Sequence, residues 1–429
     1  VRILAPQPYM KNILKNFFKA KNNSKNQSSF LKLKNQAEIK KIFDAFSLSD
    51  KCEIRFVGGC VRKILNNEHV DDIDLAVNVD PTKVKDILIQ NNINFFETGI
   101  EHGTITATIN QKRFEITSLR KDIDTDGRHA KVEFSNDWLE DASRRDFTIN
   151  SIYSDLDGNL FDPFDGKSDL KIGKIKFIGN PANRIKEDYL RILRYIRFFA
   201  IYSEIEHEEK IKKIIKQNIS GIKKISKERL LDELKKLFES SKFYNVIGDK
   251  FSLEIIDLIF PELKNIRSLI KLKDLGVSEK LNFISLICMC IIDETENSDY
   301  FLYKYNLSNE SKKRVIFLKK NFQNLNKKNF FSKNNLSKLH YKYGPSLLND
   351  LIYLKILKSN KIPKDLNNLR EYFLNRVKPE FPVKAKFLMN EFKLKEGKEL
   401  GNKLKILEEI WLNNNFEISN EEIRKQVLN

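Results

Sequence analysis

The chain has 429 residues, of which 41% are hydrophobic and 32% are charged, and its formal net charge at pH 7 is +18. This length allows two to four domains with well-formed cores. The excess of Lys and Arg suits a polyanionic partner, above all nucleic acid, although a Lys- and Asn-rich composition is also typical of AT-rich coding sequence. The apolar run at 283–292 (FISLICMCII) is too short to cross a bilayer, so we expect no membrane partner.

Cysteine and histidine usage argues against two kinds of site. The spacing of Cys52, Cys60, Cys288 and Cys290 matches neither a disulfide framework nor a tetrahedral zinc site. The five His residues are scattered and form no ligand pair. We therefore expect a reducing compartment, with Cys288 and Cys290 buried as small apolar side chains.

The first 37 residues contain several Lys and no acidic residue. Mitochondrial presequences have a similar charge but favour Arg and Ser over Lys and Asn. We therefore interpret 1–37 as a basic, loosely attached N-terminal arm. For the compartment we expect the bacterial cytoplasm, with the mitochondrial matrix as the alternative.

The segment 55–77 (RFVGGCVRKILNNEHVDDIDLAV) predicts a strand, a tight turn, a short helix and a second strand. The Gly58-Gly59 turn offers bare backbone N–H groups, which suit phosphate oxygens, and Arg62 follows one helical turn later. A Gly-Gly pair after a strand is, on its own, also compatible with an ordinary turn.

The second strand carries Asp72 and Asp74 on one face, because side chains two residues apart in a strand point the same way. Two carboxylates so placed can share divalent metal ions and promote in-line displacement at phosphorus. Alone, the pair is also compatible with two solvated acids. Together with the Gly-Gly turn and Arg62, it indicates an enzyme that transfers a nucleotide to a hydroxyl and releases pyrophosphate.

The next elements predict a small sheet domain. Residues 81–92 read as a helix, and the alternating runs 103–109 and 113–120 predict a β-hairpin. Glu115, in the second strand of that hairpin, can stand beside the D-x-D pair as a third carboxylate, or it can be an edge-strand residue paired with a Lys. The hydrophilic stretch 120–134 predicts a solvated loop with a turn at its Asp-Gly-Arg-His core.

Two polar motifs follow. The two Arg and one Asp of RRDFTINSI (144–152) could bind phosphate and ribose hydroxyls, or could form a salt bridge at a domain boundary. In EDYLRILRYIRF (187–198) a continuous helix would place Asp188 and Arg191 on one face. That pair could be a simple ion pair, or it could read the base edge of cytosine or adenine, because an acid accepts from the exocyclic amine and Arg donates to the neighbouring acceptor.

Beyond residue 180 the strand signals fade and helices dominate. The expected helices are 185–202, 207–218, 226–240, 279–293, 346–358 and 402–414, with a basic surface loop at 304–342. We therefore expect an α+β chain: the arm 1–37, a sheet-based head domain 38–170, a helical neck 171–245, and a helical body and tail 246–429.

The chain resembles the tRNA nucleotidyltransferase and poly(A) polymerase family, class II of the polymerase-β-like superfamily, in five motifs. These are G-G-x-V-R (58–62), D-x-D (72–74), F-E-I-T-S-L-R (114–120), R-R-D-F-T-x-N (144–150) and E-D-x-x-R (187–191). The match is close through residue 198 and looser in the neck-like helix 225–238 and the tail-like segment 381–416. Two departures are Lys63, where the family often has Asp, and Ala385, where it commonly has Gly.

The resemblance implies a five-stranded polymerase-β-like sheet followed by helical neck, body and tail. It also implies template-independent addition of CCA to the 3′ end of tRNA from CTP and ATP. Asp72, Asp74 and Glu115 would hold Mg²⁺ in a two-metal site. Arg145 would contact the nucleotide, Asp146 its sugar, and Asp188 and Arg191 would select C and then A. The full set of nucleotide-binding residues is expected to be Gly58, Gly59, Arg62, Arg145, Asp146, Asp188, Arg191, Arg194 and Arg197.

Two other functions are compatible with parts of the same motifs. A poly(A) polymerase shares the head domain, but 120–134 resembles the family's flexible loop, which is implicated in the switch from C to A addition and therefore favours complete CCA synthesis. A non-catalytic RNA-binding relative would be expected to have lost a carboxylate, and none is lost. Transfer RNA, CTP and ATP are thus the expected partners, while no pattern indicates an oligomeric state.

Overall fold

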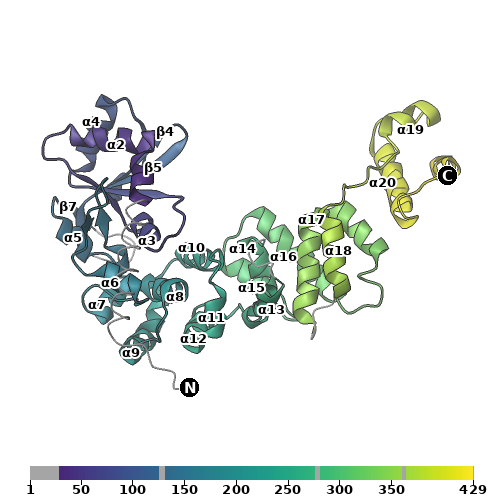
Figure 1. Ribbon diagram of the computed structural model, residues 1–429. Coiled ribbons are helices and arrows are strands. Elements are labelled where there is room, and N and C mark those ends of the chain that lie inside the picture. The colour runs from purple at the N-terminus through teal and green to yellow at the C-terminus, as the bar shows by residue number, and fades with distance from the viewer. Residues whose placement is uncertain (1–28, 125–130, 276–280, 360–363, 429) are drawn as a thin grey trace, which may run out of the picture. The chain divides into compact units, whose positions relative to one another are not determined.

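The computed structural model describes residues 29–124, 131–275, 281–359 and 364–428 (Figure 1). The chain divides into two compact units, 1–259 and 260–429. The first unit contains a sheet and the helices that follow it, and the second is helical throughout its described part. None of the described helices combines the length and the apolar character that a membrane crossing requires.

A mixed seven-stranded sheet forms the centre of the first unit, with strand order β3-β4-β5-β2-β1-β8-β9. The α+β class is therefore confirmed, although the sheet has two strands more than the five expected. Strands β2 and β5 run parallel, and the other neighbours are antiparallel. The strands are β1 (Ile54–Val57), β2 (Ile73–Val77), β3 (Asn94–Gly99), β4 (Thr104–Ile109), β5 (Lys112–Ser118), β8 (Tyr153–Ser154) and β9 (Leu160–Phe161).

Alternation along the strands gives the sheet two different faces. Leu75 and Val77 join the large core that α2 (Ala37–Ser47) and α4 (Pro81–Gln90) cover, whereas Ala76 faces a smaller cluster on the other side. Helix α4 begins after Asp80, whose carboxylate accepts from the N–H groups of the first turn. Asp74, one strand position from Leu75, therefore lies on the face opposite the large core.

The predicted hairpin is confirmed as β4 and β5. Its two central turn residues, Asn110 and Gln111, have φ of 49° and 67°. Two successive residues with positive φ give the turn twist that matches the right-handed twist of the strands. The turn sets the register in which Thr106 lies opposite Glu115.

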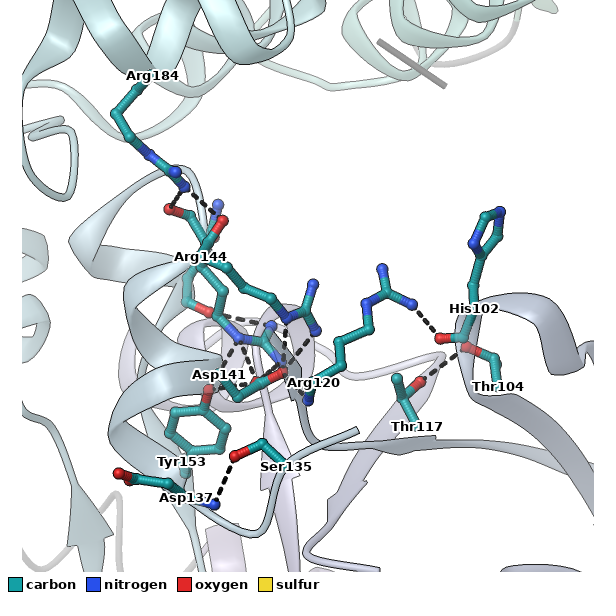
Figure 2. A network of polar contacts seen from close by, with 12 residues as sticks. His102, Thr104, Thr117, Arg120, Ser135, Asp137, Asp141, Arg144, Tyr153 and Arg184 are labelled. Carbon is teal, nitrogen blue, oxygen red and sulfur yellow. Dashed lines mark hydrogen bonds and ion pairs between the residues drawn. The ribbon is translucent and has the colours of Figure 1, made fainter. Parts of the chain in front are cut away.

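The predicted loop at 120–134 contains regular structure. β6 (Arg120–Asp124) and β7 (Lys131–Phe134) pair antiparallel as a separate two-stranded ribbon. The Asp-Gly-Arg-His turn expected between them falls in 125–130, outside the described residues. At the base of the ribbon the Arg120 side chain donates to the carbonyl of His102 (Figure 2).

The end of the segment expected to be a basic arm (1–37) contributes side chains to the core. Residues 29–34 are helical, and the Phe30 side chain is 2% exposed. Phe30 lies against Phe56, with 6.3 Å between the ring centres. It also covers Gly158, whose φ is +86° and where an added Cβ would lie 3.2 Å from the ring. Residues 1–28 lie outside the described residues.

The helix expected at 185–202 is broken in two. Asp188 is extended, with φ −151° and ψ 104°, and separates α7 (Pro181–Glu187) from α8 (Leu190–Tyr202). The other helices of this unit are α3 (Gly59–Leu65), α5 (Trp138–Ser143), α6 (Gly166–Lys171), α9 (Glu209–Asn218), α10 (Lys227–Phe238), α11 (Tyr244–Gly248) and α12 (Lys250–Ile259). Since α12 belongs to the first unit, that unit extends past the neck boundary expected at residue 245.

The second unit contains helices in a segment where the sequence predicted a surface loop. Residues 304–342 contain α16 and the first half of α17, which is kinked at Gly344 with φ 80° and ψ 172°. Cys288 and Cys290 are buried as predicted. The helices are α13 (Ile270–Asp274), α14 (Phe283–Ile291), α15 (Asn297–Lys304), α16 (Asn309–Phe322), α17 (Lys333–Lys358), α18 (Lys364–Leu374), α19 (Ala385–Phe392), α20 (Lys398–Asn413) and α21 (Asn420–Leu428).

Truncating Phe30 should destabilise the first unit. Phe30→Ala is expected to lower the free energy of unfolding by about 3–5 kcal/mol, because a buried ring is lost and a cavity remains. Leu31 is 50% exposed on the same short helix, so Leu31→Ala should change it by about 0.5 kcal/mol or less. The chain has two Trp, so Trp138 fluorescence in a Trp411→Phe background would report urea unfolding of the first unit alone. Equal effects of the two changes would contradict the burial of Phe30.

Candidate active site

The predicted carboxylates gather where β2 and β5 run side by side. Asp74 and Glu115 are direct partners in the parallel register, and Asp72 immediately precedes β2. Burial raises the pKa of Asp74, and the Glu115 and Asp72 carboxylates raise it further, while Arg145 and Arg62 act in the opposite direction. The three acids are thus electrostatic neighbours.

The donor chemistry of this group fits a hard divalent cation. Carboxylate oxygens are the ligands that such ions prefer, and a cation would relieve the repulsion that raises the pKa of Asp74. Gly59 leaves the space beside them open, since an added Cβ would lie 3.5 Å from Asp74 Oδ2. Within the described ranges, however, no set of three or more His, Cys, Asp or Glu side chains is grouped so that it could hold a metal ion.

The Gly-Gly turn separates β1 from α3. Gly58 has φ +67° and ψ −116°, a conformation that favours glycine, and a Cβ there would lie 3.5 Å from Arg145 Nη1. Arg62 is 8% exposed and donates to Asn150 Oδ1, and its guanidinium centre lies 4.8 Å from the Phe198 ring centre. The structure therefore brings Arg145 to the turn, while it holds Arg62 in the interior.

A buried carboxylate that the sequence analysis did not single out holds Arg145 (Figure 2). Asp141 Oδ2 accepts from Arg145 Nη2 at 2.9 Å and from the Tyr153 hydroxyl at 2.6 Å. Its Oδ1 accepts from Arg144 Nε at 2.8 Å and Nη2 at 2.6 Å. Burial alone would raise the pKa of Asp141, but Arg145 and Arg144 hold it well below its usual range. In the sequence, the feature that could have identified Asp141 is its spacing, since it precedes Arg144 by three residues and Arg145 by four.

Asp146 connects the head motif to helix α8. Its Oδ2 accepts from Arg194 Nε at 2.7 Å and Nη2 at 2.6 Å, and its Oδ1 accepts from Asn150 Nδ2 at 2.8 Å. Burial opposes the charged form, yet Arg194 and these hydrogen bonds lower the pKa of Asp146 to about 2. Because Asn150 also accepts from Arg62, one amide links the α3 and α8 arginines through Asp146.

The ion pair considered between Asp188 and Arg191 is not formed. Asp188 lies in the break between α7 and α8, and its Oδ2 accepts from Arg229 Nη2 of α10 at 2.7 Å. Arg191 donates instead to Glu187 Oε2 at 2.6 Å and to the Arg184 carbonyl at 2.8 Å. The simple ion-pair interpretation is therefore wrong for these partners, because the chain leaves the helical path at Asp188.

Arg194 and Arg197 share a second buried acid, Glu233 of α10, which is 2% exposed. Arg197 Nε donates to Glu233 Oε1, and Arg194 Nη1 lies 3.8 Å from Oε2. Burial lowers the pKa of Arg197; for Arg194 the same effect is outweighed by Asp146 and Glu233, so its pKa is raised. Glu233 was missed because its partners lie on another helix.

Arg184 of α7 holds the backbone of the two-arginine motif. Its Nη2 donates to the carbonyl of Arg145 at 2.6 Å and also to that of Arg144. Figure 2 shows the Arg184 side chain reaching from α7 to these carbonyls. The start of the motif is thus held through both its side chains and its main chain.

Two family profiles match parts of this chain. A family profile described as "Poly A polymerase head domain" matches residues 54–176, and one described as "Probable RNA and SrmB- binding site of polymerase A" matches 205–267. The zebrafish (Danio rerio) "CCA tRNA nucleotidyltransferase 1, mitochondrial" is 32% identical over 383 residues, which is 86% of each chain. A Lactococcus lactis "CCA-adding enzyme" is 32% identical over 86% of this chain and 90% of its own.

The human "CCA tRNA nucleotidyltransferase 1, mitochondrial" is 42% identical over 224 residues, which are 51% of that relative, so this chain spans about half of its length.

Solved structures share the fold. The Bacillus stearothermophilus CCA-adding enzyme in complex with CTP has a TM-score of 0.66 at 20% identity, covering 92% of this chain and 97% of its own. The Thermotoga maritima enzyme complexed with tRNA-CCA has a TM-score of 0.63 at 20% identity, covering 94% and 97%.

Proposed function

We propose that this chain, which belongs to the tRNA nucleotidyltransferase and poly(A) polymerase family, adds CCA to the 3′ end of tRNA from CTP and ATP. The observation that carries the proposal is the 32% identity to CCA-adding relatives over 86% of the chain. Relatives of the same fold have been solved with CTP, with ATP and with tRNA-CCA. The compartment is then the bacterial cytoplasm or the mitochondrial matrix, since the relatives come from both kinds of source.

Although these three acids do not form a ready-made metal group in the described structure, Asp72, Asp74 and Glu115 would be the ligands of two Mg²⁺ ions. Bound Mg²⁺ would activate the tRNA 3′-hydroxyl and stabilise the leaving pyrophosphate. In the reaction the 3′-oxygen loses its proton and bonds to the α-phosphorus, and the bond from that phosphorus to the pyrophosphate oxygen breaks. The backbone N–H groups at the Gly58-Gly59 turn and the Arg145 guanidinium orient the triphosphate. Their positions are set before the nucleotide arrives, which is how preorganised donors lower a barrier.

Base choice is assigned to Asp188 and Arg191 of the E-D-x-x-R motif. Asp188 would accept from the exocyclic amine of C or A, and Arg191 would donate to the acceptor beside it. U and G present a carbonyl where the amine should be. The two side chains do not neutralise each other, because Asp188 pairs with Arg229 and Arg191 with Glu187. The basic helical body and tail (246–429) would bind the phosphates of tRNA and recognise the shape of the tRNA.

A poly(A) polymerase is the second candidate, because the profile that matches the head is named for that activity. Purified protein given tRNA without its CCA end and each labelled nucleotide in turn distinguishes the two. A CCA-adding enzyme should add two residues with CTP alone, three with CTP and ATP, and then stop. Long products with ATP alone would instead establish poly(A) synthesis.

Removing either acid of the D-x-D pair should abolish incorporation of both C and A. We expect Asp72→Ala and Asp74→Ala to lower kcat/KM by about 10³-fold or more, because several kcal/mol of metal-dependent stabilisation is lost. Binding of tRNA, measured by gel shift, should stay nearly intact. Asp71→Ala is the matched control, since Asp71 is the adjacent exposed acid and pairs with Lys63. Near-normal activity of either test variant would contradict the metal site.

Truncating Arg191 should relax base choice. Arg191→Ala is expected to cost about 1–3 kcal/mol of discrimination, the range for a good bidentate base contact, so U and G incorporation rises relative to C and A. Glu187→Gln removes the ion-pair partner of Arg191 and keeps the arginine, so it should lower the melting temperature and change the ratios less than Arg191→Ala does. The measurements are kcat/KM for all four nucleotides and a melting curve. Unchanged ratios in Arg191→Ala would leave Arg191 a purely structural role.

A further inference from the structure

Helix α5 (Trp138–Ser143) contains an acid that is 1% exposed, and this acid contacts both arginines of the R-R-D motif (Figure 2). The two oxygens of Asp141 have separate partners. Oδ1 is taken by Arg144, while Oδ2 receives Arg145 and the Tyr153 hydroxyl. One carboxylate between two guanidinium groups leaves a net charge of +1 at this point of the site.

The contacts fix which edge of the Arg145 guanidinium remains available. Nε and Nη2 donate to Asp141 Oδ2 at 3.2 and 2.9 Å, and Nε also lies 3.0 Å from the Tyr153 oxygen. Nη1 is left facing Gly58, 3.5 Å from where a Cβ would stand. Among the described residues, its one acceptor is the Asn150 carbonyl at 3.5 Å, the limit of a hydrogen bond.

The Tyr153 side chain, which contacts Asp141, is also fixed by burial and by ring packing. It is fully buried, and the Trp138 ring packs against it edge-on with 5.4 Å between ring centres. The Arg145 guanidinium centre lies 5.2 Å from the Tyr153 ring centre. Burial raises the pKa of the Tyr153 hydroxyl, and Asp141 raises it further, so the hydroxyl keeps its proton and donates to Oδ2.

We propose that Asp141 is a positioning residue that presents Arg145 Nη1 to the nucleotide at the Gly58-Gly59 turn. The proposal rests on the proposed function, in which Arg145 binds the incoming nucleotide. Without a charged acceptor at Oδ2, the half-buried guanidinium of Arg145, whose side chain is 19% exposed, can rotate and its free edge leaves the turn. Misplacement of a substrate-binding group by about 1 Å can cost about 10²-fold in rate.

The test is a double-mutant cycle between Asp141→Asn and Arg145→Ala. Asparagine keeps the shape of the aspartate but removes its charge. We expect Asp141→Asn to lower kcat/KM for both CTP and ATP by about 10- to 100-fold in the wild-type background. In the Arg145→Ala background the same change should have no further effect, because the group that Asp141 positions is gone.

Glu140→Gln is the matched control, since Glu140 is the neighbouring acid of α5 and accepts from Ser135 rather than from an arginine. It should keep wild-type kcat/KM. A role of Asp141 in stability alone predicts equal losses in both backgrounds, with a lowered melting temperature. Additive losses, or an Asp141→Asn variant as active as the wild type, would overturn the proposal.

If Asp141→Asn does not fold, Tyr153→Phe provides the same test with a smaller perturbation, because it removes one donor to Oδ2 and keeps the ring. Its loss of kcat/KM should likewise disappear in the Arg145→Ala background, and persistence of the loss there would overturn the proposal. Failure of the proposed function is seen separately: the wild-type protein would then add no nucleotide to tRNA lacking CCA.

Discussion

Charge compensation in the interior is the constraint on which the first unit depends. Arginines from the R-R-D motif and α8 are largely withdrawn from water, and three buried acids, Asp141, Asp146 and Glu233, compensate them. Removing one partner of such a buried pair typically costs about 3–5 kcal/mol, because the other charge is left without compensation. The acids therefore fix where the arginines lie, and the arginines in turn tie the sheet to the helices after it.

Much of this unit was predictable because strand alternation has a strict period of two. That period predicts that the side chains of Asp72 and Asp74 point the same way, and the hairpin register follows from its short turn. The position of Glu115 opposite Asp74 depends on the parallel pairing of β2 with β5, which alternation does not specify. The break at Asp188 was not predictable, because apolar residues continue at helical spacing on both sides of it. There a carboxylate bonded to Arg229 and to the N–H of Leu190 competes with the helix.

The remaining errors have two physical causes. Two of the acids that hold the arginines act across long separations, since Asp146 meets Arg194 48 residues away and Glu233 meets Arg197 36 residues away. Such partners are set by tertiary packing alone. In the second unit, the Lys- and Asn-rich segment read as a loop is largely helical, because residues such as Val315 and Leu318 supply a narrow apolar stripe that packing completes. The overall composition of such a helix is dominated by the polar residues of its solvated face, so the few apolar residues of the buried stripe are easily overlooked.

The backbone holds the two acids of the D-x-D pair differently. Asp74 lies within β2, where the ladder to β5 fixes it, whereas Asp72 precedes the first residue of the strand and is exposed. Fixing one residue costs about 1–2 kcal/mol of conformational entropy, which for Asp74 is already lost when the sheet folds. One acid of the pair is therefore rigid and the other compliant. If the pair binds a cation as proposed, the stiffness of the chain leading into β2, and not only the number of carboxylates, would set how tightly it does so.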